Sequence, residues 1–232
     1  MTRPRNFRSK LLSKISLTDN ILECVYSVPE DFIYEPGQFV NVSVTPPFRR
    51  PYSVVEVKDS KIKLIVNITN PGKGADYFRE TKVSDETEIM GPLGRFTMKD
   101  TDYYKVFIAS GVGVAPFIPM IKKLMDPNDG KIIKTTLYLG IRSLNDDVLA
   151  RQYLIDLIEA DNEFSYVRSV TKPEHDELEF FEGRVTTLLR EQFDFDVSQT
   201  EFYVCGGNDM VKEVKQILEG YGADKVYVEN YG

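Results

Sequence analysis

The sequence has few of the side chains that hold metal ions or build disulfide frameworks. Its 232 residues include two cysteines, Cys24 and Cys205, which lie 181 positions apart, and one histidine, His175. Two cysteines cannot form a zinc cluster or a thiolate-bound iron–sulfur centre, and they do not suggest a disulfide framework. A single histidine excludes a site that needs two imidazoles. We therefore expect no metal centre.

Long apolar runs are also absent. The longest stretch without a charged residue, 106–121, has 16 residues and contains Gly and Pro, whereas a membrane-spanning helix needs about 20 apolar residues. Residues 1–14 carry five basic and no acidic side chains, but they lack the apolar core of a secretory signal and run into an alternating segment. We interpret them as the lead-in to a first strand, and we expect a cytoplasmic protein without a membrane span.

Charge divides the chain into two parts. Residues 1–99 contain 15 Lys and Arg against 12 Asp and Glu, and residues 100–232 contain 14 against 24. The net charge of the first part is thus +3 and that of the second −10, which predicts two domains, 1–99 and 100–232. Chance variation of surface charge in one domain is the alternative. The overall net charge of −7 argues against a nucleic-acid partner.

The two parts also differ in periodicity. Before residue 99, short alternating segments separated by turn signals predict an antiparallel barrel or sandwich: 10–18, 21–28, 38–44, 51–57 and 61–68. After residue 102, predicted strands alternate with a helix that ends near Met125 and with helices near 147–160, 185–192 and 210–218. Such alternation predicts a parallel sheet covered by helices. The expected fold is a β-barrel followed by a Rossmann-like α/β domain.

A glycine-rich turn follows the first predicted strand of the second domain. The segment SGVGVAP at 110–116 links that strand to a helix. Gly111 and Gly113 let backbone N–H groups approach a phosphate at the positive end of a helix, and Pro116 suits a first helical turn. The third glycine of the dinucleotide fingerprint is absent, so an ordinary strand-to-helix turn is the alternative.

A second turn of this kind, CGGNDM at 205–210, again joins a strand to a helix. Ligands collect at the carboxyl ends of parallel strands, so we expect both turns to face one crevice. Cys205 would lie at the rim of that crevice, or else be a small buried residue that ends a strand. Two such turns on one sheet favour a nucleotide site.

The first domain carries its own candidates for a ligand site. The segment RPYS at 50–53 combines a guanidinium, a proline, an aromatic ring and a hydroxyl, which can stack a planar ligand and neutralise its phosphate. An ordinary amphipathic strand is the alternative. The segment PGKGADY at 71–77 predicts a turn into a short helix and a phosphate nest. The segment GPLGRF at 91–96 predicts a structural turn between strands.

The order of these motifs resembles the ferredoxin–NADP⁺ reductase superfamily over nearly the whole chain. The shared segments are RPYS at 50–53, GKGA at 72–75, GPLGRF at 91–96, GVGVAP at 111–116, GIR at 140–142, CGGNDM at 205–210 and a terminal ENYG. Each is short, but their order and spacing argue against coincidence. The resemblance implies a flavin-binding barrel, a pyridine-nucleotide domain, and hydride transfer between NAD(P)H and bound FAD, in preference to FMN.

The resemblance also implies roles for residues of the first domain. Tyr52 is expected to stack on the isoalloxazine, and Ser53 to hydrogen-bond near the flavin N5. Arg50 is expected to bind the flavin phosphates, and Pro51 follows it in the same motif. The phosphates are also expected to meet the backbone of Gly72, Lys73, Gly74 and Ala75. The family usually has Ser or Thr where this chain has Ala75, so one hydroxyl contact with the pyrophosphate is missing.

In the second domain the resemblance implies a site for the nicotinamide nucleotide. The pyrophosphate is expected at Gly111, Gly113 and Pro116, and a ribose at Gly140 and Arg142. Cys205, followed by Gly206 and Gly207, resembles the residue beside the nicotinamide C4, while Glu229 and Tyr231 match a C-terminal pair near the flavin. Ser53, Cys205, Glu229 and Tyr231 are then the catalytic candidates, which tune polarity and orientation because the flavin performs the difficult chemistry.

The electron acceptor is expected to be a separate molecule, because the sequence has neither a ferredoxin-type cysteine cluster nor a fused haem domain. An acidic carrier, ferredoxin or flavodoxin, would suit the positive first domain, with the N-terminal arginines and Arg49 available for steering. An ordinary solvated surface is the alternative.

Two other functions stay open. The first is a flavin reductase that uses flavin as a dissociable substrate, which Ala75 would allow. The second is a non-catalytic flavin- or nucleotide-binding subunit, against which the presence of Ser53, Cys205 and Glu229 argues.

The choice between NADH and NADPH is open as well. Arg142, Lys172 and Arg184 could meet a 2′-phosphate, whereas Asp146 and Asp147 could disfavour one. The sequence does not show which of these side chains converge.

Overall fold

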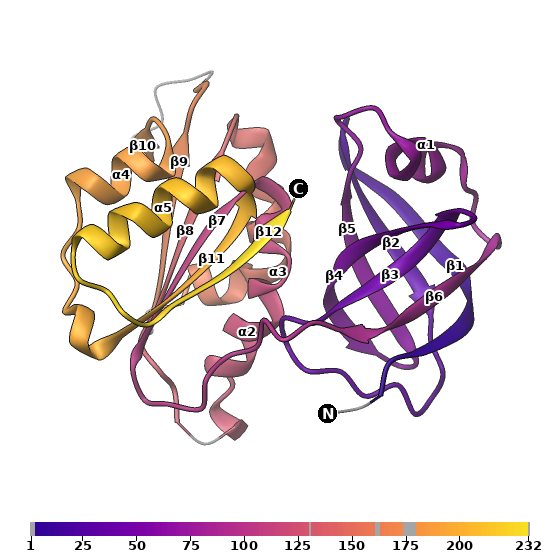
Figure 1. The fold of residues 1–232 in the computed structure, drawn as a ribbon, viewed down its shortest axis with the longest axis horizontal. Coiled ribbons are helices and arrows are strands. Elements are labelled where there is room, and N and C mark those ends of the chain that lie inside the picture. Colours follow the sequence, from indigo (N-terminus) through magenta and orange to yellow (C-terminus); the bar gives the residue numbers. More distant parts are fainter. Residues whose placement is uncertain (1–2, 130, 161–162, 174–179, 232) are drawn as a thin grey trace. The chain divides into compact units, whose positions relative to one another are not determined.

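The structure is a computed structural model that describes residues 3–129, 131–160, 163–173 and 180–231. His175 and the terminal Gly232 therefore lie outside the described residues. The chain divides into two units, Met1–Met98 and Lys99–Gly232 (Figure 1). Within the described residues, no helix combines the length and the apolar character needed to cross a membrane.

Unit 1 is a closed antiparallel barrel with the strand order β1-β2-β5-β4-β3-β6. Its strands are β1 (Arg5–Thr18), β2 (Ile21–Ser27), β3 (Phe39–Thr45), β4 (Phe48–Lys58), β5 (Lys61–Asn67) and β6 (Glu86–Leu93), and helix α1 (Lys73–Glu80) lies between β5 and β6 in the chain. Alternate residues of the strands point inward, as Leu22, Cys24 and Tyr26 of β2 do, and form the core. Helix α1 adds Ala75 and Phe78 to this core.

The strand at 86–93 is missing from the segments predicted above, and the turn predicted at 91–96 is wrong in its first half. β6 runs through Gly91 to Leu93 and pairs with both β1 and β3, and residues 94–96 follow the strand. The strand forms because these pairings close the barrel, although its own apolar alternation is weak. Gly91 is needed there for packing, since a Cβ would lie 2.7 Å from Val40 Cγ1.

Unit 2 contains a six-stranded parallel sheet with the order β10-β9-β8-β7-β11-β12. Its strands are β7 (Tyr104–Ser110), β8 (Thr135–Ile141), β9 (Phe164–Val170), β10 (Phe181–Glu182), β11 (Thr200–Gly207) and β12 (Val226–Tyr231). Its α-helices are α2 (Phe117–Leu124), α3 (Val148–Ile158), α4 (Val185–Glu191) and α5 (Asn208–Gly220). The two predicted fold classes are thus confirmed, while the two-residue strand β10 is too short to show periodicity.

Helices cover both faces of this sheet. Val106 and Ile108 of β7 belong to a core cluster that α4 and α5 complete. Phe107 lies between them, so it points to the opposite face, where its ring packs 4.9 Å from that of Phe117 in α2. The central strands β7 and β11 are therefore buried on both sides, which explains their near-continuous apolar sequence.

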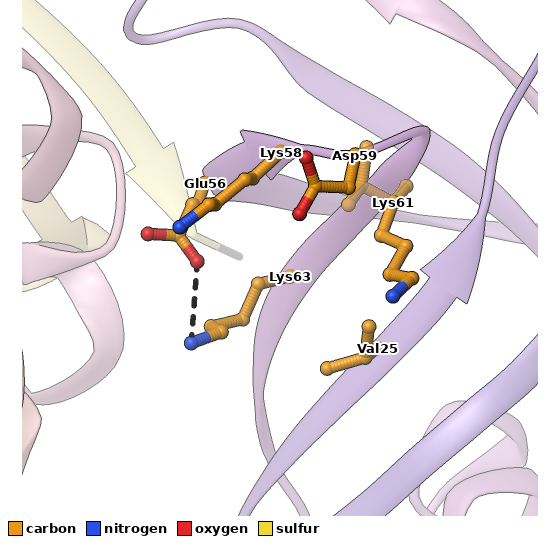
Figure 2. Close-up of a pocket in the computed structure, with 7 residues that line it drawn as sticks. Val25, Glu56, Lys58, Asp59, Lys61 and Lys63 are labelled. Carbon is orange, nitrogen blue, oxygen red and sulfur yellow. Dashed lines mark ion pairs between the residues drawn. The ribbon is translucent and has the colours of Figure 1, made fainter. Parts of the chain in front are cut away.

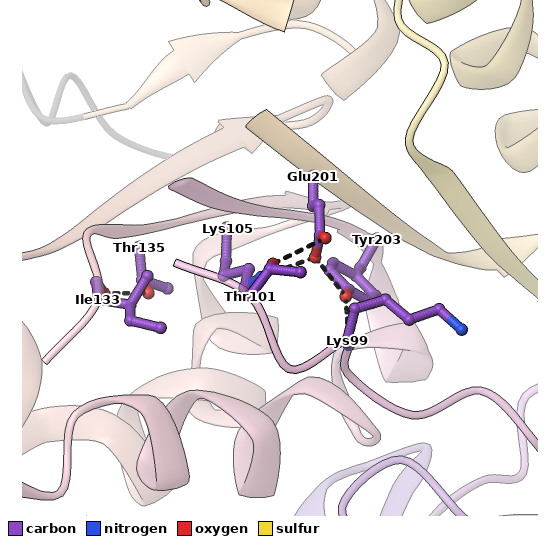
Figure 3. A network of polar contacts seen from close by, with 7 residues as sticks. All are labelled: Lys99, Thr101, Lys105, Ile133, Thr135, Glu201 and Tyr203. Atoms are coloured by element: carbon purple, nitrogen blue, oxygen red, sulfur yellow. Dashed lines mark hydrogen bonds and ion pairs between the residues drawn. The ribbon is translucent and has the colours of Figure 1, made fainter. Parts of the chain in front are cut away.

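A buried polar network ties the start of unit 2 to its sheet (Figure 3). The Lys105 ammonium, which is fully buried, lies 2.7 Å from a Glu201 carboxylate oxygen. Glu201 also accepts hydrogen bonds from Thr101, at 2.9 Å, and from Tyr203, at 2.8 Å. The Tyr203 hydroxyl in turn accepts the backbone N–H of Lys99 at 2.9 Å. The segment at 99–101 is thereby fixed to the amino-terminal ends of β7 and β11.

Candidate functional site

In the barrel, the first turn of α1 lies directly against β4. A Cβ on Gly74 would lie 2.9 Å from Tyr52 Oη and 3.5 Å from Arg50 Cγ. The glycine therefore lets the helix backbone approach these two side chains. Two motifs that are about 20 residues apart in the sequence, RPYS and GKGA, are brought together as one site.

The four residues of the RPYS segment differ in exposure. Arg50 and Pro51 are exposed, Tyr52 is half-buried and Ser53 is buried. Burial raises the pKa of Tyr52, although the nearby Arg50 acts in the opposite direction, so the phenol stays neutral. The Tyr52 ring packs edge-on against Phe78 of α1, with 5.0 Å between ring centres. This contact fixes the orientation of Tyr52.

The amino-terminal end of α1 has the backbone donors that an anion needs. No side chain caps it, and the space around Gly72, which precedes the helix, is open. The first N–H groups of a helix lack intrahelical partners and carry partial positive charge. The Ala75 methyl packs into the barrel core, so this side chain points away from that end.

A polar hollow elsewhere on the barrel has no part in this site. It has a volume of about 220 Å³ and is lined by residues of β2 and the β4–β5 hairpin, among them Val25, Glu56 and Lys63 (Figure 2). The Lys63 ammonium lies 3.4 Å from Glu56 and 3.6 Å from Glu23. None of the predicted cofactor-binding residues lines it.

In unit 2, both glycine turns lie at the carboxyl edge of the sheet, at the ends of the neighbouring strands β7 and β11. Residues 111–114 form a 3₁₀ helix that Pro116 joins to α2. A Cβ on Gly113 would overlap the carbonyl oxygen of Cys205 and lie 2.7 Å from its carbonyl carbon. The two turns therefore lie against each other, and the expectation that both face one crevice stays a prediction.

The glycines of these turns serve different purposes. Gly113 and Gly206 are packed, because a Cβ on Gly206 would overlap Ser110 Oγ and lie 2.5 Å from Met210 Cε. Gly111 and Gly207 have nothing within 4 Å of an added Cβ. The packed pair holds the strands and turns together, while the open pair leaves backbone accessible to a ligand.

A cavity of about 360 Å³ lies beside these turns. Its lining comes from the ends of β7 and β8, the starts of α4 and α5, and Thr171: Ser110, Gly140, Ile141, Thr171, Arg184, Val185, Thr186, Asp209, Met210 and Glu213. The charged groups of this lining are one guanidinium and two carboxylates. Nothing in the sequence singles out Thr171, Thr186 or Glu213, which only the tertiary structure gathers.

The acidic pair after β8 points elsewhere. Asp147 is buried, accepts a hydrogen bond from the Tyr166 hydroxyl, and lies 2.9 Å from the Arg168 guanidinium. Asp146 forms a capping box with Ser143. The Asp147 charge is thus compensated by Arg168, whereas the expectation that Asp146 could disfavour a 2′-phosphate stays a prediction. Arg142 is exposed, and its carbonyl accepts the Lys172 N–H at 2.8 Å.

The last two strands bring three catalytic candidates together. Cys205 of β11 is the register partner of Glu229 in β12, and Tyr231 hydrogen-bonds to its thiol. Cys205 is fully buried, in agreement with the alternative of a small residue ending a strand. Burial, reinforced by Glu229, raises its pKa well above the ordinary value, so it is a thiol.

Glu229 is a carboxyl group in an unusual environment. Burial raises its pKa to about 7, and its Oε2 has no hydrogen-bond partner among the described residues. A carboxyl group with such a pKa carries a proton over part of the neutral range. Cys205 therefore presents a neutral thiol at this edge of the sheet, and Glu229 a carboxyl group that gains or loses its proton near neutral pH.

Both units fit a nucleotide cofactor. In the barrel, an uncapped helix end with open backbone at Gly72 lies beside Arg50 and Tyr52. In unit 2, open backbone at Gly111 and Gly207 lies beside a cavity at the carboxyl edge of a parallel sheet, where dinucleotides bind in such folds.

Comparison with known protein families agrees with this division. The oxidoreductase FAD-binding domain matches residues 8–98, and the oxidoreductase NAD-binding domain matches residues 107–216. The electron transfer subunit of dihydroorotate dehydrogenase B (NAD(+)) in Clostridium perfringens is 30% identical over 215 residues, which are 92% of this chain and 78% of the relative. A component of the Na(+)-translocating NADH-quinone reductase of a Marinomonas species is 28% identical over 79% of this chain, which spans 48% of that relative.

Solved structures share the fold of the whole chain. A ferredoxin NADP⁺ reductase from Neisseria gonorrhoeae with bound FAD and NADP has a TM-score of 0.82 at 20% identity, covering 97% of this chain and 98% of the other. A ferredoxin reductase of carbazole 1,9a-dioxygenase has a TM-score of 0.84 at 19% identity, covering 100% and 70%. The two domain matches and the 30% identical relative, together with this shared fold, show that the chain belongs to the ferredoxin–NADP⁺ reductase superfamily of FAD- and NAD-binding oxidoreductases.

Proposed function

We propose that this protein is an NAD(P)H-dependent flavoprotein reductase that passes electrons to a separate carrier protein. The observation that carries the proposal is the presence of two nucleotide-type cradles in one chain, one at α1 and β4 and one at the β7–β11 edge. When bound, FAD supplies the redox chemistry, since it takes a hydride from a nicotinamide and releases electrons singly. The protein then has to bind the flavin and the nicotinamide nucleotide, orient their rings and provide a suitably polar environment.

In the barrel, we assign binding of the flavin to β4 and α1. Arg50 would neutralise the phosphates together with the backbone N–H groups that follow Gly72. Tyr52, held edge-on by Phe78, would stack on the isoalloxazine. Ser53 would hydrogen-bond at the flavin ring, and its burial at 4% exposure would keep water from that position.

In unit 2, we assign the nucleotide to the carboxyl edge of the sheet. The pyrophosphate would bind the open backbone at Gly111 and the start of the following helix, while Gly140 in the cavity wall would adjoin a ribose. Because the Cys205 thiol is neutral, it cannot repel or attack a bound nicotinamide. Glu229 would hold a proton there, and Tyr231 would orient Cys205.

The nucleotide donor we propose is NADH. The cavity is lined by Asp209 and Glu213 against one cation, Arg184, and Glu213 is paired with Arg190 at 2.7 Å. The Asp209 carboxylate would oppose the added negative charge of a 2′-phosphate, while Arg190 offsets the charge of Glu213. The names of the two relatives described above, which refer to a dihydroorotate dehydrogenase B (NAD(+)) and to an NADH-quinone reductase, also support this choice.

The acceptor we propose is a small electron-carrier protein such as ferredoxin or flavodoxin. It is supported by the description of one relative as an electron transfer subunit and by the net charge of +3 on residues 1–99. The arginines expected to steer it are themselves paired with carboxylates: Arg5 with Asp31, Arg8 with Glu86, and Arg49 with Glu88. Steering would therefore depend on the whole field of the barrel.

The proposal is tested by mixing the purified, FAD-loaded chain anaerobically with NADH or NADPH in a stopped-flow instrument. We expect rapid loss of the visible flavin absorbance with NADH and a slower loss with NADPH. Faster reduction by NADPH would overturn the choice of donor. FAD that stays bound and oxidised with both nucleotides would overturn the reductase itself and indicate a binding subunit.

A second measurement separates the dissociable-flavin alternative. The chain should keep FAD through gel filtration and should reduce ferredoxin or flavodoxin faster than free flavin. Loss of FAD on the column, together with saturable reduction of added flavin, would indicate a flavin reductase instead.

A further inference from the structure

Phe48, the first residue of β4, is a large aromatic side chain that is 40% exposed. The Lys73 ammonium lies over its ring, 3.0 Å from the ring centre. Lys73 is the first residue of α1, so this cation–π contact connects the helix start to β4. Lys73 thus covers one face of a partly exposed ring that lies beside the proposed phosphate site.

Phe48 shares one face of β4 with Arg50 and Tyr52, because alternate residues of a strand point to the same side. The first turn of α1 contacts all three side chains. Lys73 lies on Phe48, and Gly74 lies against Arg50 and Tyr52. The result is a row of ring, guanidinium and ring, with roughly 13 Å of strand between the two aromatic residues at about 3.3 Å per residue.

The chemical order of FAD matches this row, since the molecule consists of an isoalloxazine, two phosphates and an adenine. With the flavin on Tyr52 and the phosphates on Arg50, the second ring position is Phe48. We propose that Phe48 stacks on the adenine of FAD, and that the Lys73 ammonium leaves the ring to meet the phosphates. This inference rests on the proposed function, from which the placement of the first two groups is taken.

A hollow that shares Lys73 with this row, although Phe48 itself does not line it, favours an adenosine over a phosphate. It has a volume of about 480 Å³, and its lining includes Lys73 and Thr45, which is the strand partner of Phe48. Carboxylates make up much of the rest: Asp76, Glu80, Asp85 and Glu86. Carboxylates repel phosphate but accept hydrogen bonds from the amino group of adenine and the hydroxyls of ribose.

The arrangement makes Phe48 a specificity residue. FMN ends at a single phosphate and has no second ring, so it can use Tyr52 and Arg50 but not Phe48. Phe48 should therefore contribute to FAD binding alone, whereas Lys73 should contribute to the binding of both flavins through their phosphates.

The test measures the binding of FAD and of FMN to the full chain freed of flavin, by the change in flavin fluorescence. Stacking of a base on an aromatic side chain contributes about 1–3 kcal/mol, so Phe48→Ala should weaken FAD binding at least roughly fivefold. Binding of FMN should stay unchanged. Phe48→Trp should retain FAD affinity, while Phe48→Leu, which keeps an apolar side chain, should lose it as Phe48→Ala does.

Three outcomes contradict the inference or its basis. Equal losses of FAD and FMN in Phe48→Ala would mean that the residue only fastens β4 to α1. Unchanged FAD affinity in Phe48→Ala and Phe48→Leu would exclude a stacking role. A wild-type chain that binds neither flavin would contradict the proposed function itself, whereas FAD binding that is indifferent to residue 48 contradicts this inference alone.

Discussion

Gly74 of helix α1 in the barrel and Gly113 of the turn after β7 in unit 2 differ in what they let close to the backbone. In the barrel, Gly74 makes room for the ends of two side chains, Tyr52 and Arg50. In the sheet, Gly113 makes room for the main chain of Cys205 on the neighbouring strand. Side chains can rotate away from an added methyl group, but the main chain of a central strand cannot. The first glycine therefore shapes a ligand site, and the second is part of the fold.

The two units also differ in where their ion pairs lie. The ion pairs of Arg5, Arg8 and Arg49 lie on the barrel surface, where each contributes little to stability. Unit 2 instead buries Lys105 with Glu201 and Arg168 with Asp147. A buried pair contributes through geometry, because loss of one partner leaves the other charge without compensation.

The largest effect is expected for Gly113→Ala. The new methyl group would overlap the Cys205 carbonyl, so strand β11 or the 3₁₀ turn must move. Overpacking of this kind costs about 3 kcal/mol or more, which urea unfolding of the chain would measure. Gly207→Ala is the matched control, because nothing lies within 4 Å of its added Cβ. Equal stability of the two variants would show that the turn yields, and would remove the contrast with Gly74.

A smaller effect is expected for Glu229→Gln, which tests the raised pKa of this carboxyl group at the edge of the sheet. Burial raises the pKa of Glu229 from 4.5 to about 7, so the folded chain holds this proton more tightly than the unfolded chain does. Stability should then fall as pH rises from about 4.5 to about 7 and stay level above that. The variant should lack this fall and be more stable at pH 8 by about 2 to 3 kcal/mol.

Urea unfolding of the wild type and of Glu229→Gln between about pH 4 and pH 8 checks this expectation. Parallel stability curves for wild type and Glu229→Gln would mean that the carboxyl group ionises as an ordinary glutamate. The rate of flavin reduction should also change with a midpoint near pH 7 in the wild type and lose that midpoint in the variant.

The smallest effect is expected for Gly74→Ala. Its methyl group would meet Tyr52 Oη at 2.9 Å, and Tyr52 can shift at the cost of a less favourable rotamer. We expect FAD binding to weaken roughly tenfold, while the free energy of unfolding changes by less than about 1 kcal/mol, since Ala favours the helix. Adding Tyr52→Phe removes the hydroxyl and should restore much of the affinity. A double variant as weak as the single one would place the effect elsewhere.

Much of the fold could be predicted because its signals are local. Alternation in segments such as 21–28 and the strand–helix alternation after 102 predict a barrel and a parallel sheet, and both are confirmed. Strand β6 could not be predicted in the same way, because it depends on its pairing with β1 and β3 at long range. Its glycine and proline indicate a turn when they are read without those partners.

The candidate site also has a part that local sequence patterns predict and a part that depends on long-range contacts. RPYS and GKGA are visible as short motifs, but Phe48 carries no local signal and gains its place only from the helix that packs over it. Asp147 appears available in the sequence, yet it is buried against Arg168, which lies 21 residues further along the chain. Contacts across such distances are set by packing, which no local pattern encodes.

Local patterns in the chain are enough to set the order of most elements, β6 excepted, and the positions of the glycine turns, because periodicity and glycine act through the nearby backbone. Tertiary packing alone settles which glycines are packed and which are open, which carboxylates face the cavity, and where the Phe48 ring lies. Those features depend on residues that are far apart in the chain. Each such contact stabilises the protein only after the chain has lost the conformational entropy needed to bring both partners together.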